Sequence, residues 1–291
     1  LVGSEMCIRD SHQAHAIMSI TKTMTHLIFG RCVEDNLINL NAKVGDYLPE
    51  IGSGYADATI QNVLDMNIVN DYSEDYSDPH TTALRHNTSM GWRLPTSDVQ
   101  LTSNREFLCS IKSDDLVNRS RELNYKSAST DVLAWIAERV SGQSLHDHFV
   151  HIAEATGIEH TFHMSTDHTG IPNTNGGVCL SPRDLARFGL VFTRQCRGIN
   201  GERIGSYPFM DAARDCTGPV YPSPDSHIHY GNQLMTNGNW IGHGGWGGQL
   251  LIIDPDTATV VVFFSVLENL SASDDNHKRA IVKMAEEVIE S

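Results

Sequence analysis

Two short apolar runs near the C-terminus, separated by a turn, constrain the fold more than any other feature. Residues 250–253 and 258–265 each have the length of a strand, and Asp254-Pro-Asp-Thr257 between them is rich in turn-forming residues. The pattern predicts a hairpin of two buried strands, which other elements must cover. No apolar run approaches the roughly 18 consecutive residues that a membrane-spanning helix needs.

Most of the remaining pattern is helical. Apolar residues recur at spacings of three and four over residues 16–32, 59–66, 129–140, 182–193 and 275–290, each of which is a predicted helix. Ser181 and Pro182 are typical of a helix N-terminus, and Gly142 of a C-terminus. Residues 67–98 are polar with little periodicity and predict a long surface loop. Helices in the middle and strands at the end predict an α+β fold, with an antiparallel sheet covered by helices.

The composition excludes several classes of protein. Of the 291 residues, 40% are hydrophobic and 20% charged, which is ordinary for a globular chain. Asp and Glu number 36 against 21 Lys and Arg, so the formal net charge is −15. A field of that sign repels phosphate groups, and nucleic acid and anionic membrane surfaces are therefore not expected partners.

Residues 1–11 read as the in-frame translation of a transposase sequencing adapter, and we exclude them from the fold. A single domain is then expected over residues 12–291. The remaining cysteines are odd in number and show no CxxC spacing, which argues against a structural zinc site or a fully paired set of disulfides. Neither the compartment nor the oligomeric state is predicted.

Three polar motifs are candidates for chemistry. In Ser19-Ile-Thr-Lys22, a helix would place serine and lysine on one face, where a lysine of lowered pKa can take the serine's proton. The alternative is a solvated helix start. Tyr125, in Asn124-Tyr-Lys-Ser127, precedes a predicted helix and is placed to shuttle a proton, or else to pack its ring under that helix. Gly242-His-Gly-Gly-Trp-Gly-Gly-Gln249 leads into a strand, where a backbone N–H can face an oxyanion. No Lys-Ser/Thr pair follows it, so a phosphate-binding loop is disfavoured.

In this order the motifs resemble those of the serine β-lactamase-like hydrolases: class C β-lactamases, penicillin-binding D,D-peptidases, carboxylesterases and 6-aminohexanoate-dimer hydrolases. Ser19-Ile-Thr-Lys22 is similar to the family's Ser-x-x-Lys and Tyr125-Lys-Ser127 to its Tyr-x-Ser/Asn, while Trp246-Gly-Gly248 occupies the place of its Lys-Thr-Gly. Looser matches are residues 64–66, 74–76, 91–92 and 181–189. The set is most similar to the 6-aminohexanoate-dimer hydrolase and carboxylesterase branch.

The resemblance implies a β-lactamase/transpeptidase-like fold, an antiparallel sheet flanked by helices plus a mostly helical region. Relatives carry an N-terminal helix and two strands before the nucleophile, whereas only residues 12–18 precede it here. We therefore expect an N-terminally truncated domain, with an exposed sheet edge and reduced stability or activity.

The resemblance also implies a mechanism and a set of site residues. Ser19 attacks a carbonyl carbon, Lys22 activates it, and Tyr125 passes a proton to the leaving group. The backbone N–H groups of Ser19 and Gln249 form the oxyanion hole, and such a donor is worth on the order of 3 kcal/mol. The expected substrate-binding residues are Ser127, Trp246, Gly247, Gly248 and Tyr76. No metal or cofactor is implied.

Trp246 departs from the pattern of the β-lactamases and peptidases, in which a Lys or His stands at this position. Without that cation a substrate carboxylate has little to bind, and His243, three residues upstream, is not expected to reach. The function expected is therefore a serine hydrolase that cleaves an ester or small amide. A β-lactamase or D,D-peptidase and a catalytically silent ligand-binding protein are the alternatives.

The chain has 15 histidines, some of which lie close together in sequence. His148 and His151, spaced i and i+3, would suit a metal on one helix face, but no His-Glu-x-x-His motif is present. Scattered exposed histidines are the favoured interpretation of this group and of its neighbours, His146, His160, His163 and His168.

Overall fold

The computed structural model describes residues 13–76, 78–96, 100–267, 269 and 272–290. Residues 1–11, interpreted above as adapter-derived, lie outside the described residues. The C-terminal half carries an antiparallel sheet of five strands, in the order β4 (His229–Gly231), β5 (Leu234–Thr236), β6 (Ile241–Gly245), β7 (Gln249–Asp254) and β8 (Thr259–Phe263). β7 and β8 pair from Leu250 opposite Phe263 to Asp254 opposite Thr259. The predicted hairpin is therefore confirmed.

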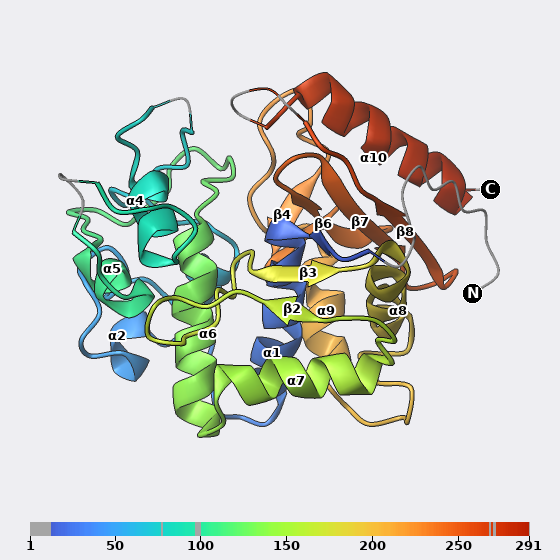
Figure 1. The fold of residues 1–291 in the computed structure, drawn as a ribbon, viewed down its shortest axis with the longest axis horizontal. Coiled ribbons are helices and arrows are strands. Elements are labelled where there is room, and N and C mark those ends of the chain that lie inside the picture. The colour runs from blue at the N-terminus through green and yellow to red at the C-terminus, as the bar shows by residue number, and fades with distance from the viewer. Residues whose placement is uncertain (1–12, 77, 97–99, 268, 270–271, 291) are drawn as a thin grey trace.

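Helices cover both faces of this sheet, as Figure 1 shows, with α10 (Asp275–Glu290) on one face and α8 (Pro182–Thr193) on the other. Successive side chains of a strand point to opposite faces. Leu251 and Ile253 accordingly join the main core, while Leu250 and Ile252 pack in a second cluster with Ile281 of α10. Both faces of β7 are thus apolar, which explains its continuous hydrophobic run.

Most of the remaining helices form a second region beside the sheet, whereas α9 (Tyr207–Ala213) contacts strand β4 of the sheet itself (Figure 1). α1 (Lys22–Glu34) packs against both α6 (Ser127–Ser141) and strands β5 and β6, so it lies between the two regions. The others are α2 (Val44–Tyr47), α3 (Ile60–Leu64), α4 (Thr82–Ser89), α5 (Asn104–Ser110) and α7 (Leu145–Thr156). A small sheet of β1 (His15–Ala16), β3 (Val178–Leu180) and β2 (His163–Met164) completes the fold. The α+β prediction is confirmed.

Two sequence-based assignments were wrong. Residues 16–32 do not form one helix, because β1 pairs His15 with Leu180 and the 3₁₀ helix η1 (Met18–Thr21) precedes α1. Residues 67–98 are not wholly a loop, because α4 lies within them and buries Ala83, His86, Thr88 and Ser89. Three of these four buried residues are polar, so the helix shows no apolar period.

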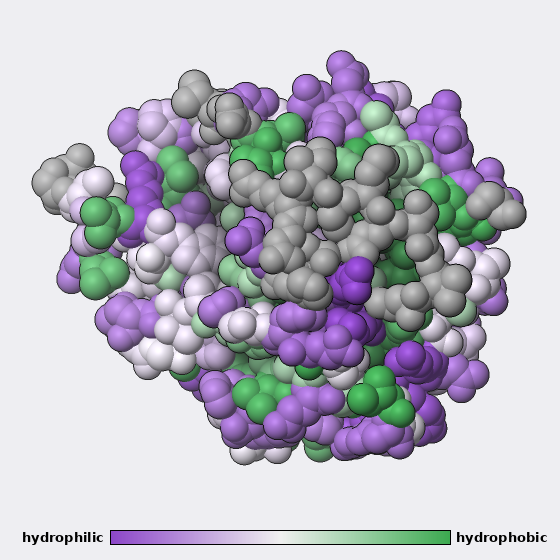
Figure 2. Space-filling view, turned by 45° about the vertical axis from the view of Figure 1, so that its right-hand side comes forward, coloured by the Kyte–Doolittle hydropathy of each residue, from purple (hydrophilic) through white to green (hydrophobic). Residues whose placement is uncertain are grey.

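The visible surface of the described residues is largely hydrophilic (Figure 2). On the face shown in Figure 2, hydrophilic residues cover much of the described surface and apolar residues are interspersed among them. Across the described ranges, helices are either too short or too polar to span a bilayer.

Candidate active site

Ser19 lies in η1, at the start of α1 and against β6. The preceding Met18 has a φ of 51°, a left-handed conformation that is unfavourable for a residue with a side chain. Buried Ile17 holds this bend, because its N–H donates to Val178 O at 3.0 Å. Ser19 itself is only partly buried, so the turn presents a hydroxyl at the surface of an otherwise packed helix end.

Lys22 points its ammonium at this hydroxyl from inside the protein. The residue is 0% exposed, and Nζ donates to Ser19 Oγ at 3.0 Å, to Ser127 Oγ at 3.2 Å and to Asn175 O at 2.7 Å. An ammonium has three protons, and each has one partner here. If Lys22 loses one proton, two donors suffice for Asn175 and Ser127, and the lone pair is left facing Ser19.

The surroundings of Lys22 favour that loss. Burial lowers the pKa of Lys22 from 10.5 to about 8, against the opposing charges of Glu74 and Asp131, which raise it. A lysine with a pKa near the working pH is a competent general base. The sequence motif alone predicted the pair, and the structure brings the two side chains together.

Tyr125 also lies next to Lys22, whose Nζ is 5.2 Å from the centroid of the Tyr125 ring. The Tyr125 hydroxyl is buried and has no hydrogen-bond partner among the described residues. Burial raises the pKa of Tyr125 well above 10, and the charge of Glu74 raises it further. Tyr125 is therefore a neutral phenol beside Ser19, and its proton is available to a ligand.

Glu74 organises the side of the site that faces Ser127. Its carboxylate accepts hydrogen bonds from the Ser127 N–H, from the Tyr72 hydroxyl at 3.3 Å and from the Tyr76 hydroxyl at 3.1 Å. The Tyr76 ring lies 6.3 Å from that of Trp246, which is 47% exposed. Two predicted substrate-binding residues, Ser127 and Tyr76, thus bind the Glu74 carboxylate, and a third, Trp246, lies near the Tyr76 ring. Glu74 itself falls only within a loose match of the sequence to the family.

Gly247 and Gly248 form the turn between β6 and β7. Their φ angles of 85° and 88° are left-handed, which explains the choice of glycine. The Gly247 N–H donates to Ala272 O and the Gly248 N–H to Gly245 O. Gln249 follows. Its Nε2 donates to Ser265 O, and its Oε1 accepts from the Ser265 N–H. The turn lies next to η1, and the N–H of Gln249 is the predicted second donor of the oxyanion hole.

His243 is a core residue of the site and not part of its surface. It is 2% exposed, Nδ1 donates to Gly244 O at 2.6 Å, and Nε2 then accepts from the Tyr230 hydroxyl at 3.1 Å. Burial, with the charge of Lys22, lowers the pKa of His243 to about 3, so it remains neutral.

The histidines weighed as metal ligands have other neighbours. His148 Nε2 binds Ser141 Oγ at 3.0 Å, and His151 Nε2 lies 3.4 Å from a Glu202 oxygen. Within the part of the chain that is described, no three His, Cys, Asp or Glu residues gather as a metal site would require.

Asp131 and Asn175 were also missed as site residues. Asp131 sits one helical turn after Ser127, and Asn175 supplies the carbonyl nearest to Lys22 Nζ. Asp131 lies opposite the apolar stripe of the predicted helix 129–140, on the face that also carries Glu138, so the sequence pattern gives no signal that it is buried.

Comparison with known proteins gives relatives both in sequence and in fold. The chain is 33% identical over 263 residues to the 6-aminohexanoate-dimer hydrolase of Paenarthrobacter ureafaciens, covering 86% of this chain and 66% of that protein. The chain thus spans just under two thirds of that relative. A structure from Bacillus anthracis, described as a candidate 6-aminohexanoate-dimer hydrolase, superposes with a TM-score of 0.81 at 23% identity, over 98% of this chain and 74% of that one.

A family VIII carboxylesterase superposes with a TM-score of 0.66 at 14% identity, over 96% of this chain and 84% of the other. These structural likenesses concern the fold. The sequence profile of the Beta-lactamase family matches residues 10–286, which is nearly the whole chain. The chain therefore belongs to the beta-lactamase family, with the β-lactamase/transpeptidase-like fold that its motifs predict.

Proposed function

We propose that the protein is a serine hydrolase that cleaves an ester or a small amide through an acyl-enzyme on Ser19. One observation carries the proposal: a fully buried lysine with a lowered pKa lies 3.0 Å from the hydroxyl of a partly exposed serine. A serine hydroxyl is a weak nucleophile until a neighbouring base removes its proton. A solvated helix start, the alternative interpretation of this motif, would leave the lysine in water.

In the first half-reaction, neutral Lys22 takes the proton of Ser19 Oγ as that oxygen attacks the carbonyl carbon. The carbonyl oxygen becomes an oxyanion, for which the N–H groups of Ser19 and Gln249 are the proposed donors. The bond to the leaving group then breaks, and the alcohol or amine leaves with a proton from Tyr125. Tyr125 regains its proton from Lys22, so Lys22 is neutral again.

In the second half-reaction, a water attacks the acyl carbon and gives up its proton along the same route. The bond to Ser19 Oγ breaks, this oxygen takes back a proton, and the carboxylic acid leaves. The high pKa of Tyr125 suits it to relay a proton and not to store a negative charge. Its unpaired hydroxyl supports this role, because a leaving-group atom would give it the partner it lacks.

The surroundings of Trp246 support an ester or small amide as substrate. Trp246 and Tyr76 offer aromatic surface, and the Tyr76 hydroxyl donates to the carboxylate of Glu74. A carboxylate on the substrate would face that negative charge without a cation in the place of Trp246. β-Lactam antibiotics and D-Ala termini carry such a carboxylate, which disfavours the β-lactamase and D,D-peptidase alternatives.

The test is labelling with a fluorophosphonate probe, together with turnover of p-nitrophenyl acetate and of nitrocefin. We expect labelling and ester turnover in the wild type, neither in Ser19→Ala, and slow nitrocefin hydrolysis at most. Ser129→Ala is the matched control, because its hydroxyl contacts Tyr55 at 3.4 Å and not Lys22. Equal labelling of Ser19→Ala and wild type, or none in either, would refute the assignment.

A further inference from the structure

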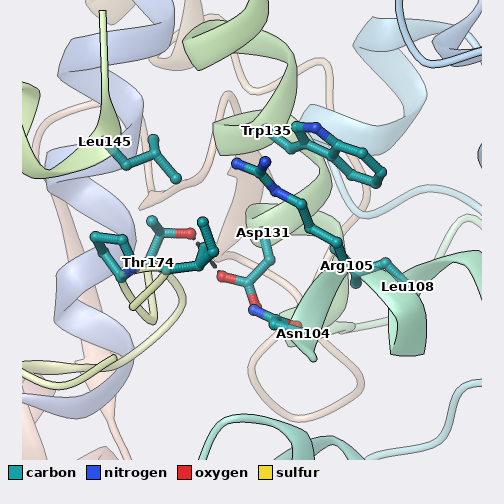
Figure 3. Close-up of a pocket in the computed structure, with 9 residues that line it drawn as sticks. Asn104, Arg105, Leu108, Asp131, Trp135, Leu145 and Thr174 are labelled. Atoms are coloured by element: carbon teal, nitrogen blue, oxygen red, sulfur yellow. Dashed lines mark hydrogen bonds between the residues drawn. The ribbon is translucent and has the colours of Figure 1, made fainter. Parts of the chain in front are cut away.

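A buried carboxylate below the site binds the segment that holds Lys22. Asp131 is 5% exposed. Its Oδ1 accepts from Thr174 Oγ1 at 2.6 Å and from the Asn175 N–H at 3.1 Å, and its Oδ2 accepts from Asn175 Nδ2 at 2.5 Å and from Asn104 Nδ2 at 3.1 Å. Figure 3 shows the carboxylate between Asn104 and Thr174, on a helix opposite the loop that carries Thr174.

Asn175 connects this carboxylate to the proposed catalytic base. Asp131 binds both the backbone N–H and the side-chain amide of Asn175, which fixes the orientation of that residue. The Asn175 carbonyl then accepts the shortest of the three hydrogen bonds that Lys22 Nζ donates, at 2.7 Å. The connection runs from Asp131 through Asn175 to Lys22 and ends at Ser19, and every link is a buried or partly buried hydrogen bond.

We propose that Asp131 is a positioning residue that acts through Asn175 to hold Lys22 Nζ against Ser19 Oγ. This inference rests on the proposed function, because it assigns a role relative to the Ser19–Lys22 pair. Asp131 is not a catalytic residue in this view, because it touches neither the serine nor the substrate.

The donor pattern requires a carboxylate at this position. All four contacts that Asp131 receives from Asn104, Thr174 and Asn175 come from N–H or O–H groups, and a carboxylate is an acceptor only. An asparagine would point its own NH₂ at donors on one side, so the 174–175 segment would have to shift. A shift of about 1 Å at a catalytic group can cost on the order of 100-fold in rate.

The charge of Asp131 also reaches Lys22. Burial opposes ionisation, but hydrogen bonds from His86, Thr174 and Asn104 hold the pKa of Asp131 below its usual value, so it is ionised. Besides Asp131, the charged or titratable groups around Lys22 are Glu74 from the loop before α4, Tyr125 ahead of α6 and His243 from β6. Losing the Asp131 charge would lower the pKa of Lys22.

The experiment compares Asp131→Asn with a matched control, Asp184→Asn. Asp184 is also fully buried and accepts from the N–H groups of Glu159 and His160. It lies at the N-terminus of α8 and binds residues 159–160 instead of Asn175. Both variants lose one buried carboxylate, so a merely structural effect should be common to them. The readouts are kcat and KM for p-nitrophenyl acetate from pH 6 to 10, with thermal unfolding to confirm the fold.

For Asp131→Asn we expect kcat to fall about 100-fold with KM changed less than about threefold. The acid limb of the pH profile, in which kcat rises as Lys22 loses its proton, should move to lower pH. Asp184→Asn should keep kcat within about threefold of wild type and an unmoved limb, at a similar loss of melting temperature. Wild-type kcat in Asp131→Asn, or equal losses in both variants with unmoved limbs, would overturn the proposal.

A second variant, Thr174→Val, decides the matter if Asp131→Asn does not fold. It removes one hydrogen bond to Asp131 at nearly constant volume and leaves the charge in place. A fall of kcat of at least about threefold with an unmoved limb supports the proposal, and wild-type kcat overturns it. Inactive wild-type protein that Ser19→Ala does not alter would instead refute the proposed function, so the two failures are distinguishable.

Discussion

The pH dependence of acylation gives the sharpest prediction about the site. With a pKa of about 8, Lys22 is the group that must lose a proton before Ser19 can attack. The neutral fraction of such a base is about 0.1 at pH 7 and about 0.9 at pH 9, so the acylation rate should rise about tenfold over this interval. A lysine in water would put the same rise above pH 10. The buried histidine beside the site, His243, has a pKa of about 3 and does not contribute to it.

The measurement is kcat/KM for p-nitrophenyl acetate between pH 6 and 10, with spontaneous hydrolysis subtracted and protein integrity checked by circular dichroism. Glu74→Gln sharpens it, because the charge of Glu74 raises the pKa of Lys22 and its loss should move the limb to lower pH. Asp184→Asn should leave the limb in place. A flat profile from pH 7 to 9, or a midpoint near pH 6.5 that points to a histidine, would refute Lys22 as the base.

Two further predictions concern stability. The pKa of Lys22 is depressed on folding, so the unfolded chain binds more protons between pH 8 and 10.5, and the wild type should gain about 3 kcal/mol relative to Lys22→Met as pH rises through that range. Urea unfolding of both proteins at pH 7.5 and 10 measures it, and parallel changes would contradict it. Gly248→Ala should destabilise by about 1 kcal/mol or more, because φ is 88° and the added Cβ would lie 3.1 Å from Ser265 Cβ. A melting temperature equal to that of wild type would show that the turn relaxes freely.

How far the fold follows from the sequence depends on the range of the interactions. The hairpin of β7 and β8 and the helix α10 were predicted because both faces of β7, and one face of α10, are marked by apolar residues near in sequence. The start of α1 was not predicted correctly, because His15 is held extended by pairing with Leu180, a residue far along the chain. α4 was not predicted, because it buries polar side chains such as His86, whose hydrogen-bond partners include Asn104 and Tyr72.

The nucleophile can likewise be predicted from a local motif, whereas the groups that activate it cannot. Ser19 and Lys22 are three residues apart on one helical turn, so a local motif suffices to pair them. Lys22 becomes a base only because it is buried, and burial without partners would cost more than folding can supply. Its partners come from 105 and 153 residues away, at Ser127 and Asn175, and no local pattern relates those positions to it.

The two acidic groups near Lys22 set how far its pKa can fall. Burial without them would leave a lysine that is neutral at low pH and forms weaker hydrogen bonds with Asn175, because a charged donor binds more strongly. Glu74 and Asp131 each raise the pKa and so keep it at about 8. Glu74 accepts from the hydroxyl of Tyr76, whose ring lies near that of Trp246, whereas Asp131 binds Asn175. A substrate that displaces water around Glu74 would strengthen the electrostatic interaction of Glu74 with Lys22. Asp131 is already shielded from solvent, so its interaction with Lys22 would not change. Substrate binding should therefore raise the pKa of Lys22 through Glu74 alone. In the wild type, kcat should then rise at a higher pH than kcat/KM does, and this difference should be absent in Glu74→Gln.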